Sequence, residues 1–338
     1  MIFLGDTAVP HSYIDSFISA MDLLPEAKVI LNLEGGVCSF GEEGMARGLF
    51  NAEKLFPVLE EKGVVAVMLA NNHISDLGEE NVSRTKNELK RLGIGVIGLK
   101  QEEPFVLDES GVQTVHIGFG WNYIQCRSKH ISLFSRKTVL TQILRCKKEF
   151  PKAKIVVHCH WDFELEAYPM PSQRSLAREM IERYGVALVI GHHPHRVQGV
   201  ECFEGGVACY SLGNWFLPQG VFMNGRLKYP EAARTILAVD WEPVSGCVTP
   251  LWFFQKEDNS LEKRECKEAE LFIENLSFRG LSDSEYISWF RKNREKRLLL
   301  PVMTEKDGEL SQMVWFVWIK IREKLISCVL CVKSLIKV

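Results

Sequence analysis

Short apolar runs recur along the chain, and each of them stops at a polar residue. Six runs rich in Val, Ile and Leu have this form, namely MIFLGD, KVILNLE, VVAVMLANNH, KIVVHCH, VALVIGHHPH and VACYSLGN. Runs of this kind are typical of strands that are buried on both faces of a sheet. Segments with helical patterns lie between them, at residues 51–62, 79–92 and 172–184. Because strands and helices alternate, the pattern predicts an α/β fold.

The later part of the chain follows two other patterns. Residues 231–254 alternate apolar and polar positions, which predicts antiparallel strands that close one sheet. From about residue 256 the pattern becomes charged and helical, over residues 256–272 and again over 284–298. We therefore expect one domain over residues 1–255 and a helical C-terminal extension over residues 256–338.

Composition narrows the class of protein. The chain has 338 residues and a net charge of -2, so it lacks the basic excess that a nucleic acid partner requires. Its ten cysteines form no short-spaced disulfide framework, which favours reduced thiols and a cytoplasmic location. Cys328 and Cys331 form a C-x-x-C pair, but they lie in an apolar helical pattern, and we do not expect them to bind metal. The first residues have neither the basic nor the long apolar region of a signal peptide.

The polar residues that end the strands are of the kinds that bind divalent metal ions. Functional groups of α/β sheets collect at the carboxyl ends of strands. Six of the nine histidines lie in only three of these endings, at His73, His158, His160, His192, His193 and His195. Oxygen and imidazole ligands suit Mn, Fe and Zn, and a pair of such ions needs a bridging acid, imidazoles and a neutral oxygen. Glu34, Asn72 and the histidines meet that requirement.

Six motifs together resemble one protein family. They are GD at 5–6, NLE at 32–34, ANNHISDLG at 70–78, HWDFE at 160–164, GHHPH at 191–195 and YSLGN at 210–214. In this order they are similar to the CapA family, bacterial capsule synthesis proteins of the calcineurin-like metallophosphoesterase superfamily. The resemblance covers residues 1–255 and implies an α/β sandwich of two central β-sheets flanked by helices.

The resemblance also assigns roles to individual residues. It implies two divalent metal ions held by Asp6, Glu34, Asn72, His160, His193 and His195, with Glu34 as the bridging acid. It implies that His73 is catalytic and interacts with the phosphate and the leaving group. Asn214 is similar to a family position near the site.

Two departures from the family pattern leave parts of the ligand set open. Asp6 is followed by Thr7 and Ala8 instead of the usual D-x-H, so one ligand is missing or replaced, and His11 is the candidate replacement. The family commonly has Gly after HW, where this chain has Asp162. His158 and His192 are interpreted as residues that support the ligands, although the sequence leaves a direct ligand role open for each.

The implied activity is hydrolysis of a phosphate ester by two metal ions that activate a water for in-line attack. A phosphorylated small molecule or polymer would be the substrate, in capsule, cell-surface polysaccharide or polyglutamate biosynthesis. Two alternatives stay open, a non-hydrolytic factor for assembly or export of a capsular polymer and a hydrolase that acts on amide bonds.

The apolar C-terminal tail, residues 312–338, contains interspersed Lys and Arg residues. Its sequence favours a helix that packs on the domain or self-associates. The alternative is a helix at the membrane surface, which would give the protein a peripheral contact with the inner face of the membrane.

Overall fold

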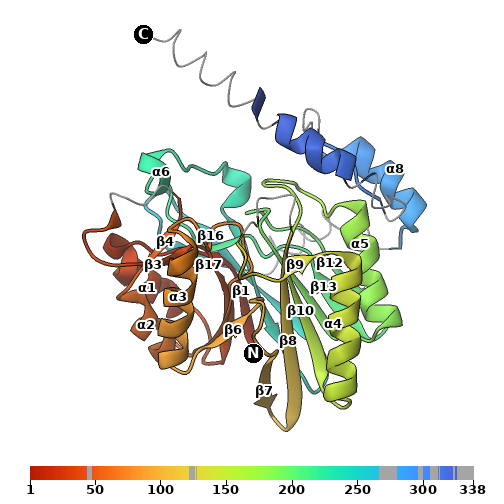
Figure 1. Ribbon diagram of the computed structural model, residues 1–338, viewed down its shortest axis with the longest axis horizontal. Coiled ribbons are helices and arrows are strands. Elements are labelled where there is room, and N and C mark those ends of the chain that lie inside the picture. The colour runs from red at the N-terminus through yellow and green to blue at the C-terminus, as the bar shows by residue number, and fades with distance from the viewer. Residues whose placement is uncertain are drawn as a thin grey trace.

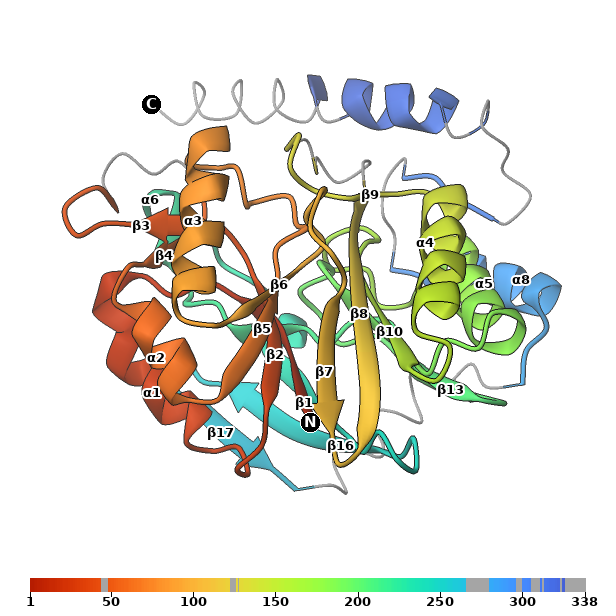
Figure 2. The same cartoon turned by 60° about the horizontal axis from the view of Figure 1, so that its bottom comes forward.

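Two β-sheets pack face to face, with helices on the outside (Figures 1 and 2). The computed structural model describes residues 1–43, 48–121, 126, 128–265, 280–295, 300–304, 311, 313–322 and 324–325. Beside the first sheet lie α1 (Ile14–Met21), α2 (Leu55–Glu61) and α3 (Glu79–Arg91), and beside the second lie α4 (Arg136–Glu149) and α5 (Pro171–Arg178). The predicted α/β sandwich of two sheets flanked by helices is therefore confirmed.

The first sheet has the strand order β17-β16-β15-β1-β2-β5-β6, and β14 also pairs with β1. Its strands are β1 (Ile2–Thr7), β2 (Val29–Leu33), β5 (Val64–Met68), β6 (Gly95–Ile97), β14 (Asn214–Phe216), β15 (Thr235–Trp241), β16 (Val248–Gln255) and β17 (Leu261–Arg264). Strands β1, β2, β5 and β6 are parallel. Strands β15 and β16 are antiparallel, as the alternating pattern predicts.

The second sheet has the order β12-β13-β11-β10-β8-β7, and β9 pairs with β8. Its strands are β7 (Phe105–Glu109), β8 (Val112–Trp121), β9 (Leu133–Phe134), β10 (Lys154–His160), β11 (Leu188–His192), β12 (Val200–Phe203) and β13 (Gly206–Cys209). The central strands β8, β10, β11 and β13 are parallel. A small separate ladder joins β3 (Gly36–Cys38) and β4 (Phe50–Ala52).

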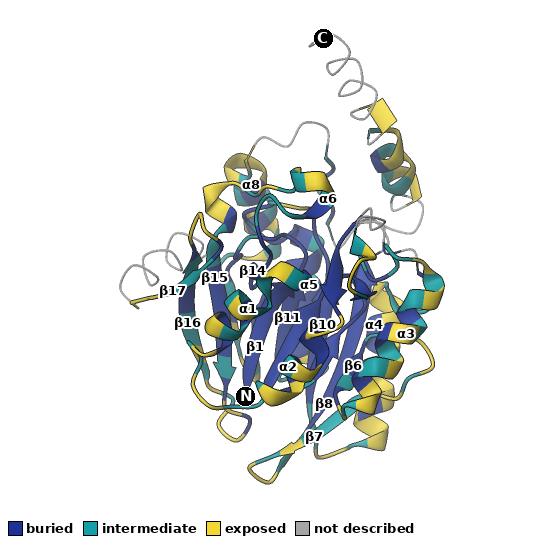
Figure 3. Cartoon of the chain, turned by 90° about the vertical axis from the view of Figure 1, so that its left-hand side faces the viewer, coloured by how far each residue is buried: buried dark blue, intermediate teal, exposed yellow. Residues whose placement is uncertain are grey.

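Buried aromatic rings join the two sheets. The ring of Phe3 on β1 lies 6.1 Å from that of His116 on β8 and 5.8 Å from that of His158 on β10. Figure 3 shows this interior as buried strands beneath helices with exposed outer faces. Strand β1 is parallel to β2, and β10 is parallel to β8. Asp6 near the end of β1 and His160 at the end of β10 lie close together, so the carboxyl ends of both strands meet at one end of the molecule.

The predicted helices occur, with shifted ends. Helix α2 begins later than expected because residues 50–52 form β4, whereas α3 agrees closely with the prediction. Helix α5 continues as a π-helical turn, η4 (Glu179–Arg183), until Gly185 at a φ of 59°. A short helical turn, α6 (Phe222–Gly225), lies in the loop after β14.

The region beyond residue 255 is partly different from the prediction. Residues 261–264, expected to be helical, form the edge strand β17, so the first sheet continues past the proposed boundary at residue 256. The expected helix at 284–298 is α8 (Asp283–Asn293), which begins with a capping box between Ser282 and Glu285. The division into two domains stays a prediction.

Helix α8 and the segment before it are held to the sandwich by a buried ion pair. Arg174 of α5 and Glu201 of β12 are 3% and 4% exposed and pair through two hydrogen bonds of 2.6 and 2.9 Å. Arg174 also donates to the carbonyl oxygen of Leu281 and lies 4.5 Å from the centre of the Tyr286 ring.

The described part of the C-terminal tail, residues 313–322 and 324–325, is helical. The rest of the predicted tail helix, including Cys328 and Cys331, lies outside the described residues. Within the described residues, no helix is long and apolar enough to span a membrane.

Candidate metal centre

The two carboxylates of the site come from neighbouring strands of the first sheet. Asp6 lies on β1 opposite Asn32 of the parallel strand β2, and Glu34 follows directly after β2. A Cβ atom at Gly5 would lie 2.0 Å from the carbonyl oxygen of Gly213, so only glycine fits before Asp6. Asp6 and Glu34 are both fully buried.

The imidazoles come from the second sheet. His160 ends β10 opposite His192, which ends β11. The loop after β11 holds His193 and His195 at φ values of 95° and 54°, in the left-handed region that non-glycine residues rarely adopt. Strain of this kind persists only where the surrounding structure fixes it, and it is common at functional sites. The backbone N–H of His193 donates to Oδ2 of Asp6 at 3.1 Å, which joins this loop to the first sheet.

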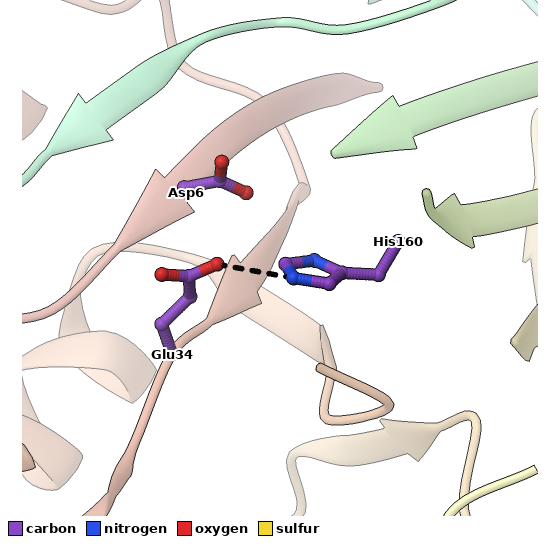
Figure 4. Close-up of side chains that lie close together, drawn as sticks. All are labelled: Asp6, Glu34 and His160. Atoms are coloured by element: carbon purple, nitrogen blue, oxygen red, sulfur yellow. Dashed lines mark ion pairs between the residues drawn. The ribbon is translucent and has the colours of Figure 1, made fainter. Parts of the chain in front are cut away.

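These side chains converge where the two sheets meet. One ligand atom each of Asp6, Glu34 and His160 lies within 4.8 Å of the others (Figure 4). Nε2 of His160 is 3.5 Å from Oε1 of Glu34 and 2.7 Å from Oδ1 of Asn72. Nδ1 of His195 is 3.2 Å from Oδ2 of Asp6, and the ring centres of His193 and His160 are 4.9 Å apart. The structure therefore brings together all six residues to which the resemblance assigns metal.

Asn32 occupies the centre of the cluster, although the sequence did not single it out. Its Nδ2 lies 2.7 Å from Oδ1 of Asp6, 3.3 Å from Oε1 of Glu34 and 3.3 Å from Nδ1 of His160. A signal was present in the NLE motif, because residues two apart on a strand point to the same face. Asn32 orients both carboxylates and holds them close together.

Several buried polar atoms of the cluster have no hydrogen-bond partner among the described residues. These atoms are Oε2 of Glu34, Nδ1 of His193 and Nε2 of His195. An unpaired buried polar atom costs on the order of 1–3 kcal/mol, so such atoms call for a ligand. Carboxylate oxygens and imidazole nitrogens are donors that Mn, Fe and Zn accept. The donor set thus fits divalent cations.

The electrostatics of the cluster couple the carboxylates to His195. Burial and the charge of Asp6 raise the pKa of Glu34 to about 7. Burial would raise the pKa of Asp6 as well, but its hydrogen bond and charge interaction with His195 outweigh burial and lower it. Burial opposes the charge on His195, yet Glu34 and Asp6 raise its pKa to about 10. Burial lowers the pKa of His160 and His193 well below the usual value, so both rings are neutral and able to bind metal.

His73 lies beside the cluster and is held by an acid. Its Nδ1 is 2.7 Å from Oδ2 of Asp76, which also accepts from the backbone N–H of Leu49 at 2.9 Å. The backbone N–H of His73 donates to Oδ1 of Asn71. Burial alone would lower the pKa of His73, but the hydrogen bond to Asp76 and the charge of Glu34 raise it. These two interactions stabilise the protonated form of His73 relative to that of a free histidine.

The structure separates the remaining candidate histidines. Nδ1 of His11 lies 2.6 Å from Oε1 of Glu43, which directs it to that acid and away from the carboxylate pair. His158 pairs with His116 at 3.2 Å, deep between the sheets, and its ring is parallel to that of His192 at 6.3 Å. Nδ1 of His192 is 3.6 Å from Oδ1 of Asp6, so His192 is the nearer of these to the cluster.

Asp162 and Asn214 form hydrogen bonds with residues around the cluster. Asp162, at a φ of 69°, accepts from the backbone N–H groups of Phe163 and Met170 and so fixes the loop after His160. Oδ1 of Asn214 lies 2.8 Å from Nδ1 of His195.

A cavity of about 560 Å³ lies beside His11, and no residue of the cluster lines it. It is lined by Pro10, His11, Ser12, Phe40, Glu43, Phe50, Val221, Phe222, Met223 and Asn224. Asn51, next to Phe50, donates to the carbonyl oxygen of Glu34 at 2.8 Å, which ties the cavity wall to the site.

Comparison with known proteins assigns the family. The bacterial capsule synthesis protein family PGA_cap matches residues 6–219, which is more than half of the chain. This chain belongs to the PGA_cap family. The CapA resemblance of its motifs is thereby confirmed.

Two curated proteins that are similar to this chain are named CapA. The chain is 29% identical over 180 residues to the capsule biosynthesis protein CapA of Bacillus anthracis, covering 50% of this chain and 44% of that protein. It is 27% identical over 173 residues to the PGA biosynthesis protein CapA of Bacillus subtilis (strain 168), covering 48% and 45%. The match thus spans less than half the length of each relative.

Solved structures show more distant likenesses. A hypothetical protein from Thermus thermophilus matches with a TM-score of 0.47 at 14% identity, over 78% of this chain and 99% of that one. A 5'-nucleotidase from Candida albicans matches with a TM-score of 0.43 at 11% identity, over 86% and 57%.

Proposed function

We propose that this protein is a metal-dependent phosphoesterase that acts in the cytoplasm on a phosphorylated small molecule or polymer during capsule or cell-surface polymer production. The observation that carries the proposal is the buried convergence of Asp6, Glu34 and His160, with ligand atoms within 4.8 Å of one another. Membership of a capsule synthesis family supports the biological setting.

Two divalent cations, Mn, Fe, Zn or similar, would be held by Asp6, Glu34, Asn72, His160, His193 and His195. Bound cations would supply Lewis acidity, which lowers the pKa of water and neutralises phosphoryl charge. Glu34 suits the bridging position because Oε1 faces His160, while Oε2 has no hydrogen-bond partner among the described residues.

His73 would act as the general acid. Its Nδ1 is engaged by Asp76, so Nε2 is the nitrogen that can donate a proton to the leaving oxygen of the ester. Asp76 would fix the ring orientation, because the same carboxylate oxygen is also held by the backbone of Leu49.

Metal analysis and turnover on the same samples test this proposal. Wild-type protein loaded with Mn²⁺ is expected to hydrolyse p-nitrophenyl phosphate, and His195→Ala is expected to lose both bound metal and turnover. The matched control is His130→Ala, because His130 lies near the surface and pairs with Glu79. That variant is expected to retain both properties.

The outcomes separate the competing functions. Metal-loaded protein without turnover on a panel of phosphate esters would overturn the phosphoesterase and favour the non-hydrolytic assembly or export role. Turnover on amide substrates alone would identify an amidohydrolase. Wild-type protein that binds no divalent cation would contradict the metal centre itself.

A further inference from the structure

The helical tail presents apolar side chains to solvent along one face. We define the tail stripe as five residues that are 46–59% exposed: Met313, Val314, Val317, Ile321 and Leu325. Four of them follow one another at intervals of four residues, which places them in one row along a helix. Large apolar side chains gathered in this way on a surface mark an interaction site.

The opposite face of the same helix packs on the protein. Ile319 is only 3% exposed, and Trp315 packs against the main hydrophobic core. At 3.6 residues per turn, these two residues lie across the helix from Val317 and Ile321. The helix is therefore anchored by one apolar face while the tail stripe points outward, so packing on the domain does not account for the stripe.

Basic residues flank the tail stripe. Lys320 and Lys324 are exposed and follow Val317 and Ile321 by three residues, which makes them neighbours on one side of the row. Arg322 lies on the other side. An apolar stripe bordered by cationic side chains is complementary to a bilayer with anionic headgroups.

The position of the helix fits a flat contact with such a surface. Figures 1, 2 and 3 all place it at the end of the molecule opposite the β7–β8 hairpin. That end holds the carboxyl ends of β8 and β10, and therefore the metal centre. We propose that the tail stripe binds the surface of an anionic lipid bilayer, with the helix in the plane of the interface and the metal centre turned toward the membrane.

Vesicle flotation with the full chain tests this contact. Wild-type protein is expected to float with phosphatidylcholine vesicles that contain phosphatidylglycerol, and much less with phosphatidylcholine alone. Val317→Gln combined with Ile321→Gln is expected to lower partitioning about tenfold or more, because each removes a buried aliphatic contact. Lys320→Gln with Lys324→Gln is expected to abolish the preference for anionic vesicles.

A matched control removes equally exposed apolar residues elsewhere. Leu144 and Val244 are 54% and 57% exposed, so Leu144→Gln with Val244→Gln is expected to leave flotation unchanged. Wild-type protein that stays at the bottom with anionic vesicles would overturn the proposal. So would light scattering that detects a wild-type dimer and a monomer of the Val317/Ile321 variant, because the stripe would then bind a second copy. None of these readouts depends on phosphoesterase activity.

Discussion

The buried histidines between the two sheets make stability depend on pH, and His116 gives a quantitative test. His116 is fully buried on β8, with Nε2 3.0 Å from Oγ1 of Thr114 and Nδ1 3.2 Å from Nε2 of His158. Burial lowers the pKa of His116 to about 3. In the unfolded chain a histidine titrates near pH ~6.5. Since the folded pKa is the lower one, the unfolded state takes up the proton, and stability is lost as the pH falls below the unfolded value.

The size of this loss follows from the two pKa values. On lowering the pH from about 7.5 to about 5.5, proton uptake by the unfolded chain at this one residue costs roughly 1.4 kcal/mol of unfolding free energy. The folded protein takes up almost no compensating proton at His116 over that range, because its pKa of about 3 lies well below it.

Urea unfolding at both pH values measures how much unfolding free energy is lost over this pH change. His116→Phe is expected to lose about 1.4 kcal/mol less stability than wild type over this pH change. Val115→Ala is the control, because Val115 is equally buried on the same strand and has no proton to gain. Val115→Ala is expected to be less stable than wild type at both pH values. Its stability is expected to change with pH as much as that of wild type. Identical pH dependence in wild type and His116→Phe would refute the buried neutral histidine.

Three further predictions concern the ion pair, the acid and the centre of the cluster. Arg174→Met leaves the carboxylate of its partner buried and is expected to cost about 3–5 kcal/mol by urea unfolding, whereas Arg136→Met at the surface is expected to change stability little. A small effect at Arg174 would contradict its structural role. Asp76→Ala is expected to lower kcat roughly tenfold or more with KM nearly unchanged, since it misorients His73 as general acid; an unchanged kcat would argue against that role. Asn32→Ala is expected to weaken Mn²⁺ binding about 10- to 100-fold in calorimetric titration, and equal affinity would show that it does not orient the ligands.

The sequence predicted the ends of the buried strands well, because their physical signal is local. A run of apolar residues that stops at Asp6, Glu34 or His160 marks both a strand and its carboxyl end. Parallel pairing then brings such ends together whatever their separation in the chain. This reasoning indicated where functional groups collect, whereas the set of six metal ligands was implied by the resemblance to the CapA family.

Features that depend on contacts between distant segments could not be predicted from local patterns in the sequence. Strand β17 is an edge strand whose Lys263 and Arg264 are exposed, so it lacks an apolar alternation and resembles a charged helix in sequence. Asn32 reads as an ordinary strand residue, and its role follows only from the three side chains that surround it. The burial of Arg174 likewise depends on Glu201, which lies on another element.

The division of the metal centre between two sheets has a consequence for the whole molecule. Asp6 and Glu34 belong to one half of the sandwich, and His160, His193 and His195 belong to the other. A complete set of donors exists only while both halves are docked, so binding of a cation there would be linked to the cohesion of the interior. Separation of the two sheets would then release a bound cation, and removal of the cation would weaken the contact between the sheets.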